Sequence, residues 1–247
     1  MNQLDNIAKQ LRSLRLGAAA SQLATLVATA EANEESYLSF AESLVSHEIT
    51  QRNVNRIKRH YKQAQFPNEK RLDLFDYRHQ TTVTKRQING LLDFSFIDER
   101  QNVIFIGPPG VGKTHLAIGI GHEAIQAGYK VLFRNALTLV EELELAEMKG
   151  ELKKRLTQLS KYDLIIIDEL GYLPMSRQSR YNLFQLINSL YEYRSIILTT
   201  NKDFTSWGEF FHDDNVAVPI IDRIIHHSHI FMLGGESYRL KEKVSKT

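Results

Sequence analysis

The spacing of apolar residues changes along the chain. In the first 65 residues, apolar side chains recur at three- and four-residue intervals, as at Leu4, Ile7 and Leu11. This spacing lines one face of an amphipathic helix, and the segment contains no proline and a single glycine. We therefore expect residues 1–65 to form a small all-α domain whose last helix ends near Gln65.

The helical pattern ends at Pro67, and the following residues predict an extended segment over 66–83. Aromatic and aliphatic residues in such a segment indicate docking onto a neighbouring surface rather than free flexibility. Four side chains are expected to anchor it: Phe66, Leu72, Phe75 and Tyr77.

The rest of the chain alternates between short apolar runs and helical patterns. Strands are expected at 103–106, 130–134, 164–168, 195–200 and 230–233. Helices are expected at 115–126, at 137–159 with a break near Gly150, at 178–193 and at 220–226. This alternation predicts an α/β fold, in which helices cover both faces of a mostly parallel five-stranded sheet.

Composition narrows the classes of protein. The chain has 247 residues, of which 43% are hydrophobic and 24% charged, as in ordinary globular proteins. It has no cysteine, which excludes disulfides, thiolate catalysis and cysteine-ligated zinc. No apolar run reaches membrane-spanning length, and the amphipathic N-terminus does not resemble a signal peptide. We expect a cytoplasmic protein without a membrane partner.

The stretch "VIFIGPPGVGKTHLAIGIG" fits G-x-x-x-x-G-K-[ST] at every fixed position. Its glycines allow backbone N–H groups to approach phosphate oxygens, and the positive end of the next helix faces the same anion. Lys113 would lie near the β- and γ-phosphates, and Thr114 would offer its hydroxyl to Mg²⁺. The nucleotide-binding residues are expected to be Gly107, Pro108, Pro109, Gly110, Val111, Gly112, Lys113, Thr114 and His115.

Two later strands end in polar residues at the same expected sheet edge. "DLIIIDELG" ends in Asp168, which would hold Mg²⁺, and Glu169, which would polarise the attacking water. "SIILTTN" ends in Asn201, which could orient that water or contact the γ-phosphate. The acidic pair favours hydrolysis over phosphoryl transfer, because a small-molecule kinase needs an acceptor pocket that the sequence does not reveal.

The segments "GPPGVGKTHLA", "IIIDELGYLP", "ILTTN", "DRIIHHSHI" and "ESYRL" together resemble AAA+ ATPases of the initiator and helicase-loader branch. They are most similar to IstB-type transposition helpers, with DnaC-type helicase loaders as relatives. The resemblance implies an AAA+ core that binds ATP and Mg²⁺, forms homo-oligomers with inter-subunit ATP sites, binds duplex DNA and partners a transposase. A DnaC-like helicase loader is the alternative function.

The resemblance also implies roles for two arginines. Arg223 matches an arginine finger that reaches the nucleotide of a neighbouring subunit, and Arg239 matches a sensor arginine near the nucleotide. Only 14 residues, 234–247, follow the last expected strand, so the C-terminal lid typical of AAA+ proteins would be minimal. The expected domains are a DNA- or partner-binding domain at 1–65, a docking linker at 66–95 and an ATPase domain at 96–247.

A basic run is the expected DNA-binding surface. No acidic residue occurs between Gln51 and Pro67, and the basic side chains form neighbouring rows on a helix. The expected DNA contacts are Arg52, Arg56, Lys58, Arg59 and Lys62. A second basic cluster at 149–155 could face DNA, but ion pairs with nearby glutamates explain it equally well.

Overall fold

The structure, a computed structural model, describes residues 2–171, 175–203, 206–207, 214–239 and 241, with only the backbone at 214–217. Residue contacts divide the chain into two compact units, Met1–Arg59 and His60–Thr247. Residues 172–174 of the motif "IIIDELGYLP" and most of the segment after Arg239 lie outside the described residues. The functional domains expected with boundaries at residues 65 and 95 remain a prediction.

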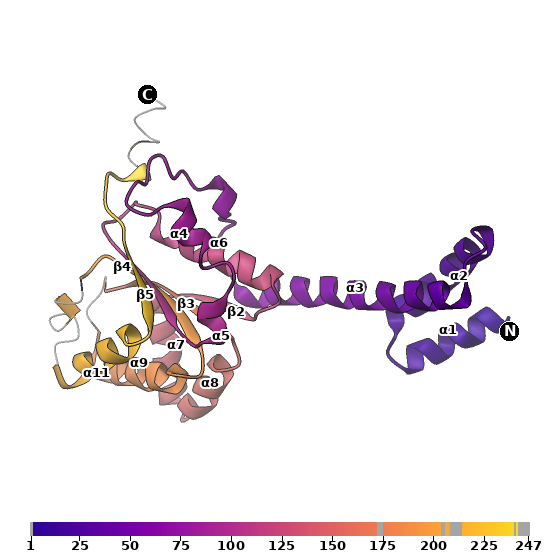
Figure 1. The fold of residues 1–247 in the computed structure, drawn as a ribbon. Coiled ribbons are helices and arrows are strands. Elements are labelled where there is room, and N and C mark those ends of the chain that lie inside the picture. Colours follow the sequence, from indigo (N-terminus) through magenta and orange to yellow (C-terminus); the bar gives the residue numbers. More distant parts are fainter. Residues whose placement is uncertain (1, 172–174, 204–205, 208–213, 240, 242–247) are drawn as a thin grey trace. The chain divides into compact units, whose positions relative to one another are not determined.

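The first unit is helical, as the sequence predicts. It contains α1 (Gln3–Ser13), α2 (Gly17–Ala32) and most of α3 (Tyr37–Ala64) (Figure 1). The buried carboxylate of Glu48 on α3 accepts a hydrogen bond from the backbone N–H of Ala19 at 2.9 Å. This bond satisfies one of the free N–H groups at the start of α2 and joins α2 to α3.

The second unit contains the predicted parallel sheet. Its strand order is β2-β3-β4-β1-β5, and every neighbouring pair is parallel. The strands are β1 (Asn102–Ile106), β2 (Val131–Asn135), β3 (Leu164–Leu170), β4 (Ser195–Thr200) and β5 (Ser228–Met232). The helices of this unit are α4 (Lys85–Asn89), α5 (Ser95–Asp98), α6 (Lys113–Gln126), α7 (Ala136–Met148), α8 (Leu152–Leu159), α9 (Arg177–Leu190) and α11 (Asp214–Ile225).

The core lies between the sheet and its helices. Figure 1 shows α6 on one side of the sheet and α7, α9 and α11 on the other. Every residue of β1 and β4 is buried, because strands covered on both faces have no solvent side. The phosphate loop follows β1, the acidic pair lies in β3, and Asn201 follows β4. The parallel order therefore brings all three to the carboxyl edge of the sheet.

The expected break near Gly150 is confirmed, since Gly150 adopts φ +67° between α7 and α8. Other expected boundaries differ from the observed ones. The helix after the phosphate loop begins at Lys113, two residues earlier than expected. The helix expected at 220–226 begins at Asp214 as α11 and contains Pro219, which the pattern had placed before the helix.

The segment after α3 docks on α6, as expected. It contains a short 3-10 helix, Leu72–Leu74. Leu72 packs where a side chain on Gly119 would stand, since a Cβ there would come within 2.6 Å of it. The ring of Phe66 lies against Gly121 in the same way, since a Cβ on Gly121 would stand 2.9 Å from it. Small residues on α6 thus allow the linker to lie close to the helix that follows the phosphate loop.

No helix in the described part of the chain combines the length and the apolar character needed to cross a bilayer.

Candidate functional site

The phosphate loop between β1 and α6 needs glycine at two positions. Gly110 and Gly112 have φ of +84° and +99°, where other residues are strained. A Cβ on Gly110 would stand 2.1 Å from the hydroxyl oxygen of Ser237, and one on Gly112 would stand 2.6 Å from the ring of Phe75. The linker and the C-terminal segment therefore both pack directly on the loop.

Lys113 begins α6 and is buried. Its ammonium donates hydrogen bonds to the carbonyl oxygens of Gly107 and Pro108 at 2.7 and 2.8 Å. Burial lowers the pKa of Lys113, while the carboxylates of Asp168 and Glu169 act in the opposite direction. The cation is thus held over the loop by neutral acceptors that an anionic ligand can replace.

Asp168 and Thr114 meet at the expected metal position. The hydroxyl of Thr114 donates to Oδ1 of Asp168 at 2.8 Å, and the hydroxyl of Thr199 on β4 donates to the same oxygen at 2.6 Å. Burial raises the pKa of Asp168, although both hydrogen bonds act to lower it. The buried carboxylate of Asp168 and the hydroxyl of Thr114 together offer the oxygen ligands that a hard cation takes.

Glu169 reaches the same site because β3 is irregular there. Consecutive side chains of a regular strand point to opposite faces. The pairing of β3 with β4 shifts between Ile167 and Leu170, and Glu169 adopts φ +62°. Its backbone N–H donates to the hydroxyl of Thr199 at 2.9 Å. The irregularity allows both carboxylates to serve one site.

Asn135 contacts Glu169, a role that sequence reasoning missed. Its side-chain amide donates to Oε2 of Glu169 at 2.9 Å, while its oxygen accepts from the N–H of Leu137 and caps α7. The capping role could have been found from an asparagine placed between a strand and a helix. The contact with Glu169 could not, because it depends on the pairing of β2 with β3.

The phosphate loop, Thr114 and Glu169 line a cavity of about 460 Å³. Its lining combines the phosphate loop, Glu169, the linker and the C-terminal segment. The linker and C-terminal residues are Asn68, Lys70, Leu74, Phe75, Asp76, His79, Gln80, Tyr238 and Arg239. Arg239 lowers the pKa of Lys113 by its charge, so two cations converge on one cavity, as a site for an anion requires. His115 also lines the cavity and bonds the carbonyl oxygen of Arg71 at 2.7 Å.

The structure does not bring Asn201 and Arg223 into this cavity. Asn201 follows β4, and its buried side-chain oxygen has no hydrogen bond among the described residues. Arg223 lies on α11, where it donates to the carbonyl oxygen of Pro219 and sits 5.3 Å from the ring of Phe184. It lines a small space that includes Asn102, at the amino edge of the sheet and so opposite the phosphate loop.

The expected DNA-binding residues of α3 are not equivalent. Arg52 pairs with Glu48 at 2.7 Å and donates to the carbonyl oxygen of Arg15 at 2.6 Å, so it joins α3 to the turn after α1. Arg52 and the other four side chains are all exposed, but Arg56, Lys58, Arg59 and Lys62 make no ion pair among the described residues. The second basic cluster, at 149–155, takes part in ion pairs, since Lys154 pairs with Glu151 at 2.9 Å.

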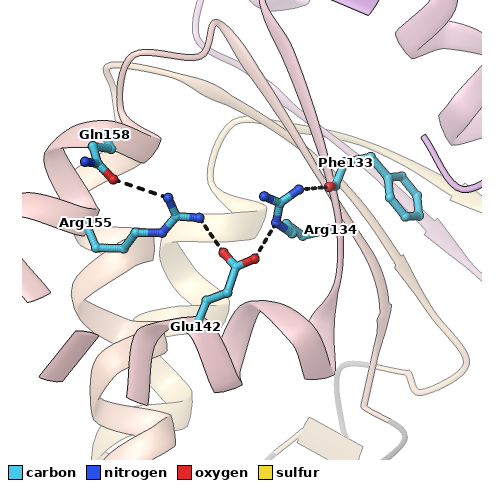
Figure 2. Close-up of polar contacts among 5 residues, drawn as sticks. All are labelled: Phe133, Arg134, Glu142, Arg155 and Gln158. Carbon is cyan, nitrogen blue, oxygen red and sulfur yellow. Dashed lines mark hydrogen bonds and ion pairs between the residues drawn. The ribbon is translucent and has the colours of Figure 1, made fainter. Parts of the chain in front are cut away.

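Arg155, another member of the basic cluster at 149–155, belongs to the network drawn in Figure 2. Glu142 on α7 accepts from Arg134 on β2 at 2.9 Å and from Arg155 on α8. Arg155 also reaches Gln158, and Arg134 donates to the carbonyl oxygen of Phe133. One carboxylate therefore ties both helices to the end of β2, next to Asn135.

Comparisons with known proteins identify the family of this chain. The family model described as "IstB-like ATP binding protein" matches residues 9–246. "Insertion sequence IS5376 putative ATP-binding protein" of Geobacillus stearothermophilus is 43% identical over 97% of this chain and 95% of its own length. The protein of the same description from insertion sequence IS21 of Pseudomonas aeruginosa is 40% identical over 98% of this chain and 91% of its own length.

Solved structures share the fold at lower identity. The DnaC helicase loader matches with a TM-score of 0.55 and 21% identity, over 71% of this chain and 99% of that chain. DnaA from Aquifex aeolicus bound to AMPPCP matches with a TM-score of 0.55 and 20% identity, over 74% of this chain and 57% of that one. These likenesses identify the second unit as a P-loop fold of the AAA+ type.

Proposed function

Because the chain belongs to the family of IstB-like ATP-binding proteins, we propose that it hydrolyses ATP and uses this cycle on duplex DNA to assist a transposase. One observation carries the proposal of hydrolysis. The phosphate loop, Thr114 and Glu169 border one cavity, and Asp168 accepts a hydrogen bond from Thr114. A site that only stored nucleotide would not need a second carboxylate there.

The loop would bind the triphosphate through backbone N–H groups and the start of α6. Lys113 would exchange the carbonyl oxygens of Gly107 and Pro108 for oxygens of the β- and γ-phosphates. Arg239 adds a second positive charge from the C-terminal segment. The linker side of the cavity, including Leu74 and Phe75, offers apolar surface to the rest of the nucleotide.

Thr114 and Asp168 would hold Mg²⁺, and their oxygens already lie 2.8 Å apart. When bound, the ion would neutralise part of the phosphate charge. Burial raises the pKa of Asp168, although the charge of Lys113 acts to lower it. A bound cation would offset this cost of burial, which fits a metal ligand.

Glu169 would act as the base. Its carboxylate would take a proton from water as the water oxygen bonds to the γ-phosphorus and the bond to the oxygen of the leaving ADP breaks. Thr199 fixes the backbone of Glu169, and Asn135 fixes the carboxylate.

Arg223 could act only on another subunit, since it lies at the sheet edge opposite the phosphate loop of its own chain. In a homo-oligomer it would complete the site of a neighbour and stabilise charge on the γ-phosphate. ATP binding would then favour assembly, because the bound nucleotide bridges two subunits.

The DNA and transposase steps rest on other observations. Arg56, Lys58, Arg59 and Lys62 are exposed on one helix, and the relatives carry the names of insertion sequences. The helicase-loader alternative rests on the likeness to DnaC. A transposition helper should prefer duplex DNA, whereas a loader should prefer single strands, so binding to both forms separates the two.

Two variants test the ATPase. Lys113→Ala should weaken ATP binding at least about tenfold, because a charge-assisted contact to the phosphates is lost. Glu169→Gln should bind ATP normally but hydrolyse it about a hundredfold more slowly, because the base is lost. Lys130→Ala, a change at an exposed lysine, is the matched control. Full hydrolysis by Glu169→Gln would contradict the proposed mechanism.

A further inference from the structure

Arg223 on α11 is held against two aromatic rings. Its guanidinium carbon lies 5.3 Å from the centre of the Phe184 ring and 5.9 Å from the centre of the Tyr191 ring. Phe184 belongs to α9, and Tyr191 directly follows that helix. A guanidinium over an aromatic ring is attracted by the negative charge of the ring face. The two rings therefore restrict the positions that the Arg223 side chain can take.

Tyr191 also contacts the residue that follows α11. The hydroxyl of Tyr191 and Nδ1 of His226 form a hydrogen bond of 3.2 Å. The backbone N–H of His226 donates to the carbonyl oxygen of Asp222 at 2.9 Å, so His226 continues the last turn of the helix. Arg223 and His226 are three residues apart and lie on one face of that turn. Tyr191 thus joins the end of α9 to α11 at two points.

Most of the hydrogen-bonding capacity of Arg223 is unused within the described residues. A guanidinium has five N–H donors, and the one hydrogen bond of this side chain among those residues goes to the carbonyl oxygen of Pro219 at 3.1 Å. Arg223 makes no ion pair in the same part of the chain. In the small space that it lines, Arg100 and Arg194 add positive charge, and Glu192 is the single carboxylate among the described lining residues. This space is therefore suited to an anion brought by another molecule.

We propose that Phe184 and Tyr191 are positioning residues that orient Arg223 toward the γ-phosphate bound to a neighbouring subunit. This role rests on the proposed action of Arg223 in a neighbour's site. A long side chain such as arginine loses conformational entropy when it is fixed in one place. The rings fix it within the folded subunit, before the neighbour binds, so less ordering remains when the transition state forms.

The opposite role for the rings would be storage, in which they keep Arg223 away from the interface. A stored guanidinium would have its donors satisfied within its own chain, because an unused buried donor is costly. Arg223 instead keeps most of its donors unused beside an electropositive space. The geometry therefore favours positioning, and the two roles predict opposite effects of removing a ring.

The rate of ATP hydrolysis by the full chain tests the proposal. Tyr191→Leu removes the ring but keeps apolar bulk, so it should lower kcat about tenfold while KM for ATP stays within about twofold. Tyr191→Phe keeps the ring and loses the bond to His226, so it should lower kcat less than about threefold. Phe184→Leu repeats the test with the other ring. Tyr193→Leu is the matched control, since Tyr193 is 68% exposed and should be replaceable without effect.

Mixed assemblies show whether Tyr191 acts in the site of a neighbour. Lys113→Ala subunits bind ATP poorly but carry an intact Arg223. Adding them to Tyr191→Leu should raise hydrolysis per Tyr191→Leu subunit, because intact neighbours then supply a positioned arginine. Adding the double variant Lys113→Ala/Arg223→Ala should give no such rise. A role of Tyr191 in the nucleotide site of its own subunit would give no recovery with either partner.

A double variant separates positioning from a general effect on packing. Tyr191→Leu/Arg223→Ala should hydrolyse ATP at the rate of Arg223→Ala, because Tyr191 acts only through Arg223. A further loss in the double variant would overturn the proposal. So would unchanged or faster hydrolysis by Tyr191→Leu, or an absence of recovery in the mixed assemblies.

The same measurements distinguish this role from the proposed function. If Arg223→Ala slows hydrolysis while Tyr191→Leu and Phe184→Leu do not, only the positioning role is wrong. If Arg223→Ala keeps the wild-type rate while Glu169→Gln is slow, the action of Arg223 in a neighbour's site is wrong, and the positioning role is overturned with it. If Glu169→Gln also keeps the wild-type rate, the proposed mechanism of hydrolysis is wrong.

Discussion

Gly112 lies where the phosphate loop has neither backbone freedom nor space for a side chain. Its φ of +99° is strained for other residues, and the ring of Phe75 occupies the position of a Cβ. The loop amides can face a phosphate only while this backbone is kept. The same residue thus serves linker docking and, in the proposed function, nucleotide binding.

We expect Gly112→Ala to lower the free energy of unfolding by about 2 kcal/mol or more and to weaken ATP binding, because backbone strain and the clash with Phe75 add. Urea unfolding and calorimetric titration with ATP measure the two effects. Gly150→Ala is the matched control, since Gly150 has φ +67° but open space around it. Equal losses in the two variants would show that the contact with Phe75 contributes nothing.

Burial of the ionised Asp168 carboxylate lowers the stability of the ligand-free protein. Burial raises its pKa, so the folded state favours the protonated carboxyl more than the unfolded state does. The contribution of this group to stability is therefore largest at low pH and is lost as pH rises through the pKa in the folded state. Sites that bind metal often carry such a cost.

Asp168→Asn should therefore raise the urea midpoint of the ligand-free protein at pH 7 to 8, because the neutral amide keeps an oxygen for Thr114 and Thr199 without the buried charge. The gain over wild type should shrink toward pH 4, where the wild-type carboxyl gains its proton. Unfolding curves across this range provide the measurement. A variant less stable than wild type at pH 8 would count against burial as the dominant cause.

At the scale of elements, the end of β2 connects helix packing to the site. Arg134 holds α7 and α8 through Glu142, and the adjacent Asn135 both caps α7 and contacts Glu169 (Figure 2). The position of α7 relative to β2 therefore bears on the placement of the Glu169 carboxylate, the proposed base.

Glu142→Ala should destabilise the protein by about 2 kcal/mol, because two partly buried guanidinium groups lose their shared carboxylate. It should also slow ATP hydrolysis more than it weakens ATP binding, since the effect would reach Glu169 through Asn135. Glu147→Ala removes an exposed carboxylate from the same helix and should stay within about 0.5 kcal/mol of wild type. Similar losses in both variants would refute a specific role for the network.

At the scale of the whole molecule, the chain joins a small helical unit to the unit that contains the phosphate loop through a single continuous helix. α3 begins in the first unit and ends in the second, and the exposed basic residues lie near this junction. The linker that follows α3 contacts α6 and then the phosphate loop. Covalent continuity thus connects the expected DNA-binding surface to the nucleotide site.

Lys58→Glu/Lys62→Glu should weaken binding to duplex DNA by at least about tenfold and lower the salt slope by about two, because two phosphate contacts are lost. ATP binding without DNA should be unchanged. The matched control is Lys149→Glu/Lys153→Glu, the same charge change in the alternative basic cluster. Gel shifts at several salt concentrations provide the test, and an equal loss in the control would show that the basic run of α3 is not the specific surface.

Much of the fold followed from local pattern. Apolar runs gave all five strands, and three- and four-residue spacing gave the N-terminal helices. The errors were at ends, as where α11 begins at Asp214 and includes Pro219. Proline usually ends a helix, but Pro219 lies inside α11, so the residue alone did not fix the boundary.

The sequence by itself determined the residues that depend on local chemistry. A glycine loop before a helix and acids after an apolar strand are patterns of consecutive residues. The sequence therefore predicted that Lys113, Thr114 and Asp168 lie at one site, and the structure brings Thr114 and Asp168 into contact. Tertiary structure alone decided how distant segments meet. The contact of Asn135 with Glu169, the packing of Ser237 and Phe75 on the loop, and the use of Arg52 within the first unit each join residues whose separation in sequence follows no period. Such contacts arise from strand order and helix packing, which local periodicity does not encode.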